Sequence, residues 1–118
     1  KSANKNVRIL SNFAELPVMV DGNMYKTGEH AFQAEKFLFI AKTATESRQQ
    51  LLIIQAQKVI NASTSKEAKR YGGRSSFELN LVERQKWTEE ALHVTRNICQ
   101  YKYDTYPESS TIIRVLSN

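Results

Sequence analysis

The sequence has 118 residues, of which 41% are hydrophobic and 25% are charged, and its net charge is +5 at neutral pH. This length fits one domain with one core, and we expect residues 1–118 to form it. No apolar run approaches the roughly 18 residues of a membrane span. No amino-terminal signal segment is visible, so a cytoplasmic location is expected. The pI near 9.4 favours anionic partners, although a solvated surface with a modest basic excess explains it equally well.

The sequence predicts neither a metal site nor a cofactor. Its single cysteine, Cys99, cannot form an internal disulfide, and we expect it to be a small buried hydrophobic side chain rather than a nucleophile. The two histidines, His30 and His93, have no Cys or His partner at the spacing of metal ligands. Phosphate-loop, dinucleotide and nucleophile-elbow motifs are absent as well.

The first predicted elements are strands. Val7–Leu10 is a candidate short strand. A β-hairpin is predicted where Pro17–Val20 and Asn23–Lys26 flank Asp21-Gly22. Asp-Gly favours a type I′ turn, because both central residues of that turn take positive φ.

A helix is predicted from Gly28 to Ala41, with Thr27 as its N-cap. Two stripes run along it. The apolar stripe consists of His30, Ala34, Phe37 and Ala41. The polar stripe consists of Glu29, Gln33 and Lys36, at positions i, i+4 and i+7. Because it lies on the apolar stripe, His30 is interpreted as a hydrogen-bonded core histidine.

A second helix is predicted from Glu46 to Asn61. Its expected buried residues are Leu51, Ile54, Val59 and Ile60. After it, Thr64 and Glu67 match a capping box, which opens a short helix. That helix is predicted to end at Tyr71, since Gly72 suits the C′ position.

The last long helix follows the predicted loop Gly73–Leu79, is capped at Asn80 and reaches about Tyr103. Its core stripe is Trp87, Ala91, Val94, Ile98 and Tyr101. Ser110–Leu116 is a candidate final short helix. The expected fold is α+β and mostly helical, with a small β-hairpin or short sheet packed on four to five helices.

The stretch around the hairpin carries a distinctive order of motifs. Ser11-Asn12-Phe13 precedes the Asp-Gly turn, and the following helix reads Glu-His-x-x-Gln-x-x-Lys from Glu29. Ala68-Lys69, Gly72-Gly73-Arg74 and then Trp87 come next. This order resembles the NADAR (YbiA-like) family, and the resemblance runs from about Val7 to Tyr103.

The resemblance implies a hydrolase that cleaves an N-glycosidic bond in a ribose-phosphate compound. Members of this family act on phosphorylated intermediates of riboflavin biosynthesis or remove ADP-ribose from modified targets. The expected partner is therefore a phosphorylated ribosyl small molecule or an ADP-ribosylated target. Nucleic acid is expected only as a modified substrate, and no membrane partner is implied.

The resemblance also implies residue roles. Glu29 is the expected catalytic carboxylate, because it lies in the first turn of a helix, where the helix dipole favours an ionised acid. It would stabilise an oxocarbenium-like ribosyl cation or activate water. The expected substrate-binding residues are Asn12, Phe13, Gln33, Lys36, Lys69, Arg74 and Trp87. Core packing explains the two aromatic residues equally well, and the cations can be solvated surface charges.

The sequence departs from the family at its end. The family's C-terminal block, in which an acidic residue precedes a Trp-Gly pair, has no counterpart before Asn118. Two further hypotheses therefore stay open. One is a non-catalytic module that binds ADP-ribose or a related nucleotide. The other, favoured only by the positive charge, is a nucleic-acid-binding domain.

Overall fold

The structure is a computed structural model and describes residues 15–106. The elements are β1 (Val18–Val20), β2 (Asn23–Tyr25), α2 (Gly28–Ala41), α3 (Glu46–Ile60), α4 (Ser65–Gly72) and α5 (Leu81–Thr105). These four helices and one two-stranded antiparallel sheet confirm the predicted α+β, mostly helical fold. The predicted strand Val7–Leu10, the predicted helix Ser110–Leu116 and the site candidates Asn12 and Phe13 lie outside the described residues.

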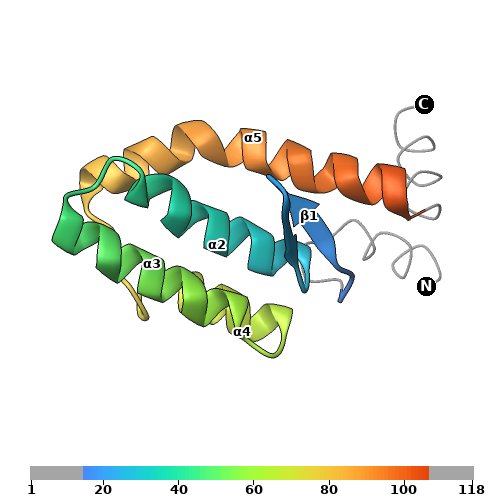
Figure 1. Cartoon of the computed structure of the whole chain (residues 1–118), viewed down its shortest axis with the longest axis horizontal. Coiled ribbons are helices and arrows are strands. Elements are labelled where there is room, and N and C mark those ends of the chain that lie inside the picture. Colours follow the sequence, from blue (N-terminus) through green and yellow to red (C-terminus); the bar gives the residue numbers. More distant parts are fainter. Residues whose placement is uncertain (1–14, 107–118) are drawn as a thin grey trace.

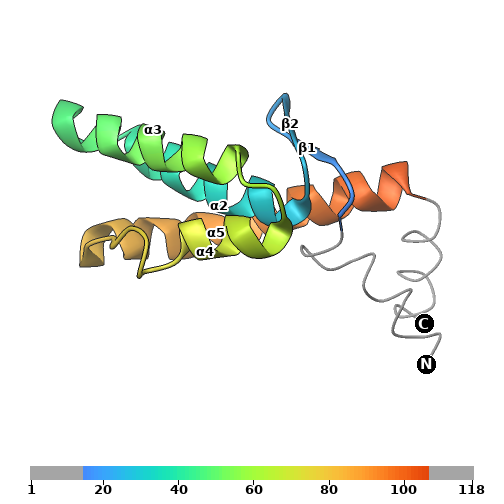
Figure 2. The same ribbon diagram turned by 90° about the horizontal axis from the view of Figure 1, so that it is seen from below.

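Helix α2 is the centre of the molecule. It packs against α3, α4 and α5, and both strands of the hairpin contact its beginning. In Figure 1 it runs between α3 and α5, antiparallel to both, with the hairpin at one end. Figure 2 shows α3 and α2 above α4 and α5. The core therefore lies around α2, whose two stripes face different neighbours.

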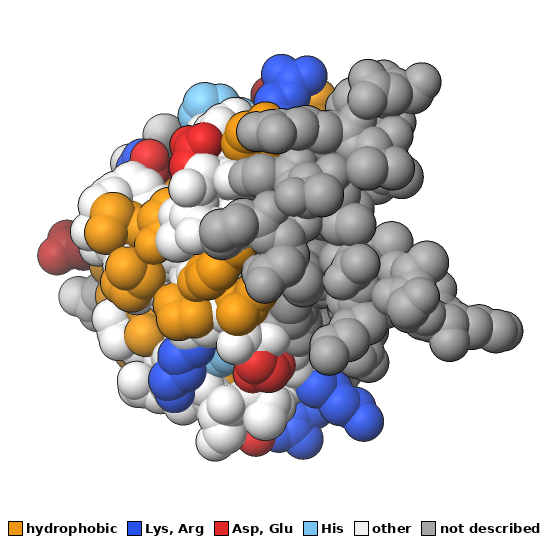
Figure 3. Space-filling model, turned by 90° about the vertical axis from the view of Figure 1, so that its right-hand side faces the viewer, with side chains coloured by type: hydrophobic (Ala, Val, Ile, Leu, Met, Phe, Trp, Pro, Cys, Tyr) orange, Lys and Arg blue, Asp and Glu red, His pale blue; other side chains and the backbone are white. Residues whose placement is uncertain are grey.

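The hairpin has the predicted turn. Asp21 and Gly22 have φ angles of 51° and 81°, as a type I′ turn requires. One face of the hairpin is buried, and the opposite face carries the exposed cross-strand pair Met19 and Met24. Figure 3 views the molecule from the hairpin end, where hydrophobic side chains gather beside the grey residues.

The amino terminus of α2 is fixed by a buried polar contact. Thr27 caps the helix, since its hydroxyl oxygen accepts from the backbone N–H of His30 at 3.2 Å. The ring of His30 is fully buried, with Nδ1 2.7 Å from the Thr27 hydroxyl and Nε2 2.9 Å from the Ala62 carbonyl. A carbonyl can only accept, so Nε2 carries the proton and Nδ1 accepts from the hydroxyl. The prediction of a hydrogen-bonded core histidine is confirmed.

The buried face of α3 differs from the predicted one. The helix begins at Glu46 as predicted, but Leu51 and Ile54 are 51% and 57% exposed. The buried residues are Leu52, Gln55, Ala56 and Val59. The prediction was wrong for Leu51 and Ile54 because the run of apolar residues does not show which face of the helix is buried. In addition, the face that packs on α2 and α4 includes a glutamine. Gln55 is buried because its Nε2 donates to the Tyr71 carbonyl and the Ser76 hydroxyl, both at 2.8 Å.

The caps of α4 and α5 follow the sequence closely. Thr64 caps α4 through the N–H of Glu67, but the Glu67 carboxylate accepts from the N–H of Ser63 rather than that of Thr64. Asn80 and Glu83 form a complete capping box on α5. The predicted core stripe of α5 is buried or partly buried throughout. Within residues 15–106, no helix combines the length and apolarity needed to cross a membrane.

Two neighbouring leucines can test which face of α3 is buried. Leu52→Ala should lower the free energy of unfolding by about 2–5 kcal/mol, because it leaves a cavity in the core. Leu51→Ala, on the exposed side, should change it by less than about 0.5 kcal/mol. Urea unfolding followed by circular dichroism measures both. Equal losses of unfolding free energy in the two variants would contradict the observed burial of Leu52 and exposure of Leu51.

Candidate functional site

The predicted catalytic acid is inside the molecule. Glu29 lies in the first turn of α2 and is only 6% exposed. Gln33, one turn further along, donates from Nε2 to Glu29 Oε2 at 2.6 Å. The two residues therefore share a face of α2, as the i, i+4 spacing predicted.

The polar stripe of α2 meets the end of α4 at Gly72. Lys36 Nζ donates to the Gly72 carbonyl at 2.6 Å. A Cβ atom added to Gly72 would lie 2.1 Å from Gln33 Oε1 and 2.6 Å from its Cγ. A side chain at this position would force Gln33 to move, whereas glycine lets the Gln33 side chain lie directly on the backbone of α4.

This contact corrects the prediction for Gly72. We expected Gly72 to end the short helix at the C′ position, where glycine is favoured for its positive φ. In the structure α4 continues through Gly72, and its C-cap is Gly73 with a φ of −85°. Positive φ occurs in the described residues only at Asp21 and Gly22. Gly72 is small because Gln33 packs on it, and not because the chain turns there.

The amide of Gln33 has one orientation. Its Nε2 must face Glu29, because a carboxylate accepts hydrogen bonds and cannot donate them. Oε1 is thereby directed toward Gly72 and has no hydrogen-bond partner within the described part of the chain. A buried acceptor without a donor is unfavourable, so the hydrogen bond from Nε2 to Glu29 is formed at a cost on the other side of the amide.

A cavity of about 460 Å³ opens beside this junction. This volume is in the range of small-molecule sites. Three cations and two aromatic rings contribute to the lining, which consists of Lys36, Gly72, Arg74, Phe77, Leu79, Arg84, Trp87 and Thr88. Of the predicted site residues, the cavity brings together Lys36, Arg74 and Trp87. Glu29 and Gln33 are not among its lining residues, although they share a face of α2 with Lys36.

The aromatic walls are held by packing. The ring of Trp87 lies 5.1 Å from that of Phe32 in an edge-to-face arrangement. Phe77 packs in the same manner on Phe37 at 5.5 Å, and the guanidinium of Arg48 lies 4.7 Å from the centre of the Phe77 ring. Trp87 therefore packs on α2 and also lines the cavity, while its role in substrate binding stays a prediction.

Among the described residues, two lysines and three glutamates are buried, namely Lys36, Lys102, Glu29, Glu35 and Glu83. Burial lowers the pKa of Lys36 to about 8, and the charge of Glu29 opposes this effect. Burial also lowers the pKa of Lys102, which is 0% exposed, while Cys99 and Glu29 act in the opposite direction. Sequence reasoning missed Lys102. The available signal was its place on α5, four residues after Ile98 and therefore on the core stripe.

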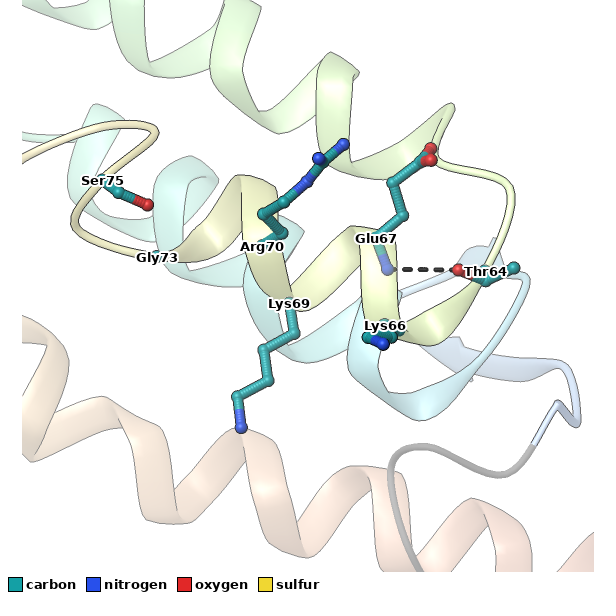
Figure 4. Close-up of a pocket in the computed structure, with 7 residues that line it drawn as sticks. All are labelled: Thr64, Lys66, Glu67, Lys69, Arg70, Gly73 and Ser75. Carbon is teal, nitrogen blue, oxygen red and sulfur yellow. Dashed lines mark hydrogen bonds between the residues drawn. The ribbon is translucent and has the colours of Figure 1, made fainter.

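The remaining predicted cations lie further out. The Arg74 side chain is 78% exposed and pairs with Glu78 at 3.7 Å, a contact that contributes little in water. Lys69 lines a second cavity of about 560 Å³ together with Gly73 and Ser75 (Figure 4). In that view Lys69 extends toward α5 and Arg70 extends away from it. Arg84, in the first turn of α5, lines the first cavity and was missed because its signal is an ordinary exposed arginine.

The fold and the cavity define a small α+β protein with a cavity that is lined by cations and aromatic rings. No protein-family model and no solved structure matches the chain. A stretch of 28 residues, 24% of the chain, is 64% identical to the N-glycosidase YbiA of Shigella flexneri and to the protein of the same name from Shigella flexneri serotype 5b (strain 8401). The match covers 18% of the length of each of those proteins. The chain is thus similar, over a short stretch, to an N-glycosidase.

Gly72→Ala tests the close approach of α4 to α2. The new methyl group must displace Gln33 and break its bond to Glu29, so the free energy of unfolding should fall by about 1–3 kcal/mol. Gly73→Ala is the matched control, since its Cβ would lie 3.3 Å from the Arg70 carbonyl oxygen and should cost less. Urea unfolding measures both, and the side-chain amide signals of Gln33 in NMR spectra report the displacement. A Gly72→Ala variant as stable as the parent would show that the junction is loose.

Proposed function

We propose that this protein is a hydrolase that cleaves the N-glycosidic bond of a ribose-phosphate compound, either an ADP-ribosyl conjugate or a phosphorylated intermediate of riboflavin biosynthesis. The observation that carries the proposal is the continuity of one helix face. A buried carboxylate, Glu29, is joined through Gln33 to the junction where Lys36 enters a cationic cavity. The local similarity to an N-glycosidase supports the reaction class.

The lining of the cavity fits the parts of such a substrate. Arg74 and Arg84 offer planar guanidinium groups for phosphate, and Lys36 adds a buried point charge. Trp87 offers a ring for stacking against a base. The sugar then lies toward Lys36 and Gly72, because these lining residues border the junction with Gln33 and Glu29.

Glu29 is assigned one of two roles, electrostatic stabilisation of the ribosyl cation or general-base activation of water. As the bond between C1′ and nitrogen breaks, its electron pair leaves with the base, and positive charge develops on the ribosyl carbon. The carboxylate stabilises this charge or takes a proton from the attacking water, whose oxygen bonds to C1′. That proton finally resides on the departing nitrogen, so the products are a ribose phosphate and a protonated base.

One observation favours a second function, a module that binds ADP-ribose or a related nucleotide without cleaving it. The lining of the cavity holds cations and rings, whereas Glu29 is not part of it. Such a lining binds a nucleotide without any acid or base. Calorimetry with ADP-ribose, combined with an assay for released base, distinguishes the two functions, because the module binds tightly without turnover.

Glu29→Gln keeps the shape of the side chain and removes its charge. With ADP-ribosyl or riboflavin-precursor substrates, kcat/KM should fall by about 10²-fold or more, since a positioned acid or base contributes that much. The affinity for ribose 5-phosphate should change little. Glu35→Gln is the matched control on α2, because Glu35 is also buried but accepts from Tyr25 at 2.5 Å, away from the cavity. If the Glu29→Gln variant turns over substrate at the parental rate, Glu29 is not the catalytic carboxylate.

Binding of a phosphate should depend on pH through Lys36. Its pKa of about 8 means that the ammonium is charged below this pH and neutral above it. A phosphate monoester is already a dianion there, with a second pKa of about 6, so only the lysine changes charge. The affinity for ribose 5-phosphate, measured by calorimetry on both sides of pH 8, should therefore fall as pH rises.

Arg74→Ala provides the control for this measurement. An arginine stays charged throughout the range, so the variant should bind more weakly at every pH and keep the same pH dependence. Lys36→Met should lose that dependence. If the affinity of the parent is flat through pH 8, Lys36 does not contact the phosphate.

A further inference from the structure

One wall of the cavity, which carries Phe77 and Leu79, belongs to a segment without helix or strand. This segment, residues 73–80, connects α4 to α5. Its first turn is closed by hydrogen bonds from the backbone N–H groups of Ser76 and Phe77 to the Gly73 carbonyl, both at 3.1 Å. Where regular secondary structure does not pair the backbone, side chains of other elements supply contacts. The position of this wall therefore depends on such side chains.

Arg48 on α3 makes several of these contacts. Its guanidinium donates from Nε and Nη2 to the two carboxylate oxygens of Glu83, both at 2.8 Å. Nη2 also donates to the Glu78 carbonyl at 3.1 Å, and the guanidinium lies 4.7 Å from the centre of the Phe77 ring. One side chain thus holds the segment at two neighbouring residues and joins it to the first turn of α5, where Glu83 lies.

Two further contacts hold the same wall. The Phe77 ring packs edge-to-face on Phe37 of α2 at 5.5 Å. Gln55 of α3 donates from Nε2 to the hydroxyl of Ser76 at 2.8 Å. Phe77 is thus held by α2 and α3 together, and α3 fixes the preceding residue as well. Arg48 is not among the lining residues of the cavity, so it acts on the cavity only through the residues that it holds.

We propose that Arg48 is a positioning residue of the candidate site, which keeps the Phe77 wall of the cavity in place before a ligand arrives. This inference rests on the proposed function, because it takes the cavity as the place where the ribosyl phosphate binds. A wall that is already in place spares the ligand the cost of ordering it, so Arg48 contributes to affinity. The rate of bond cleavage depends little on Arg48, because its side chain does not reach the cavity.

The contacts of Arg48 require an arginine and not simply a positive charge. A planar guanidinium can bond both oxygens of a carboxylate and lie against a ring at the same time, whereas lysine has a single nitrogen. The hydrogen bond from Arg48 lowers the pKa of the Glu83 carboxyl group, so this group is ionised at neutral pH. Replacement by lysine therefore keeps the charge and removes the geometry.

Arg48→Lys tests the role without changing the net charge. The Arg48 side chain is 30% exposed, so a lysine can place its ammonium in water and the variant should fold, as circular dichroism would show. Its affinity for ribose 5-phosphate, measured by calorimetry, should fall about tenfold, the equivalent of roughly one lost hydrogen bond. In hydrolysis, KM should rise by a similar factor and kcat should stay within about twofold, as expected when only binding is lost.

Val59→Ala is the matched control. Val59 is fully buried on the same helix, about 16 Å further along its axis than Arg48. The variant should lose stability through a cavity in the core, and the folded protein should keep the parental affinity. An equal loss of affinity in Val59→Ala would overturn the proposal, because the effect would then be a general consequence of lower stability.

A second measurement needs no ligand. Trp87 is the single tryptophan of the chain, is 9% exposed and lines the same cavity as Phe77. Acrylamide should quench its fluorescence more strongly in Arg48→Lys than in the parent or in Val59→Ala, because a displaced wall uncovers the ring.

The two measurements separate this proposal from the proposed function. Parental quenching in Arg48→Lys would overturn the positioning role whatever the affinity, and so would parental affinity for a ligand that the parent binds. If the parent binds no ribose 5-phosphate, the proposed function fails at this cavity, whereas stronger quenching in Arg48→Lys would still establish that Arg48 holds the wall.

Discussion

The junction of α2 and α4 depends on the absence of a side chain at Gly72. Because Gly72 has no Cβ, Gln33 can pack directly on its backbone, and Lys36 can reach its carbonyl from the same face of α2. These contacts fix the Gln33 amide, which in turn holds the carboxylate of Glu29 through Nε2. The polar stripe of α2 is thereby enclosed by protein instead of water. The position of the Gln33 amide beside Glu29 and Gly72 follows from this close approach.

Enclosing that stripe has an electrostatic consequence. Glu29, Lys36 and Lys102 are all buried, and the pKa values of both lysines are lowered by desolvation. Desolvation of the Lys36 ammonium is costly in a medium of low dielectric. In the proposed function, an anion bound in the cavity beside Lys36 offsets part of this cost. Such a loss of stability in the free protein is typical of functional sites.

Local signals in the sequence predicted the hairpin and the caps at Thr27 and Asn80, because the deciding contacts lie within a few residues of each other. The buried face of α3 was not predictable in this way. Four consecutive apolar residues, Leu51–Ile54, fit either face, and packing against α2 and α4 selects one. The need for glycine at position 72 was also invisible, since its partner is 39 residues away. For the site, the family resemblance named Lys36, Arg74 and Trp87, and only the fold brings them to one cavity.

Arg74 and Glu29 lie at different depths, and in the proposed function this separation divides binding from chemistry. Arg74 is largely in water, where its charge attracts an anion over a distance but each contact is worth little. Glu29 is enclosed, where a fixed charge interacts strongly with positive charge that develops nearby and needs little reorganisation. Affinity for the phosphate can therefore persist when the acid is removed, whereas stabilisation of a ribosyl cation cannot. The two proposed functions, a binding module and a hydrolase, use the same cavity, and they differ in whether the enclosed carboxylate acts on the ligand.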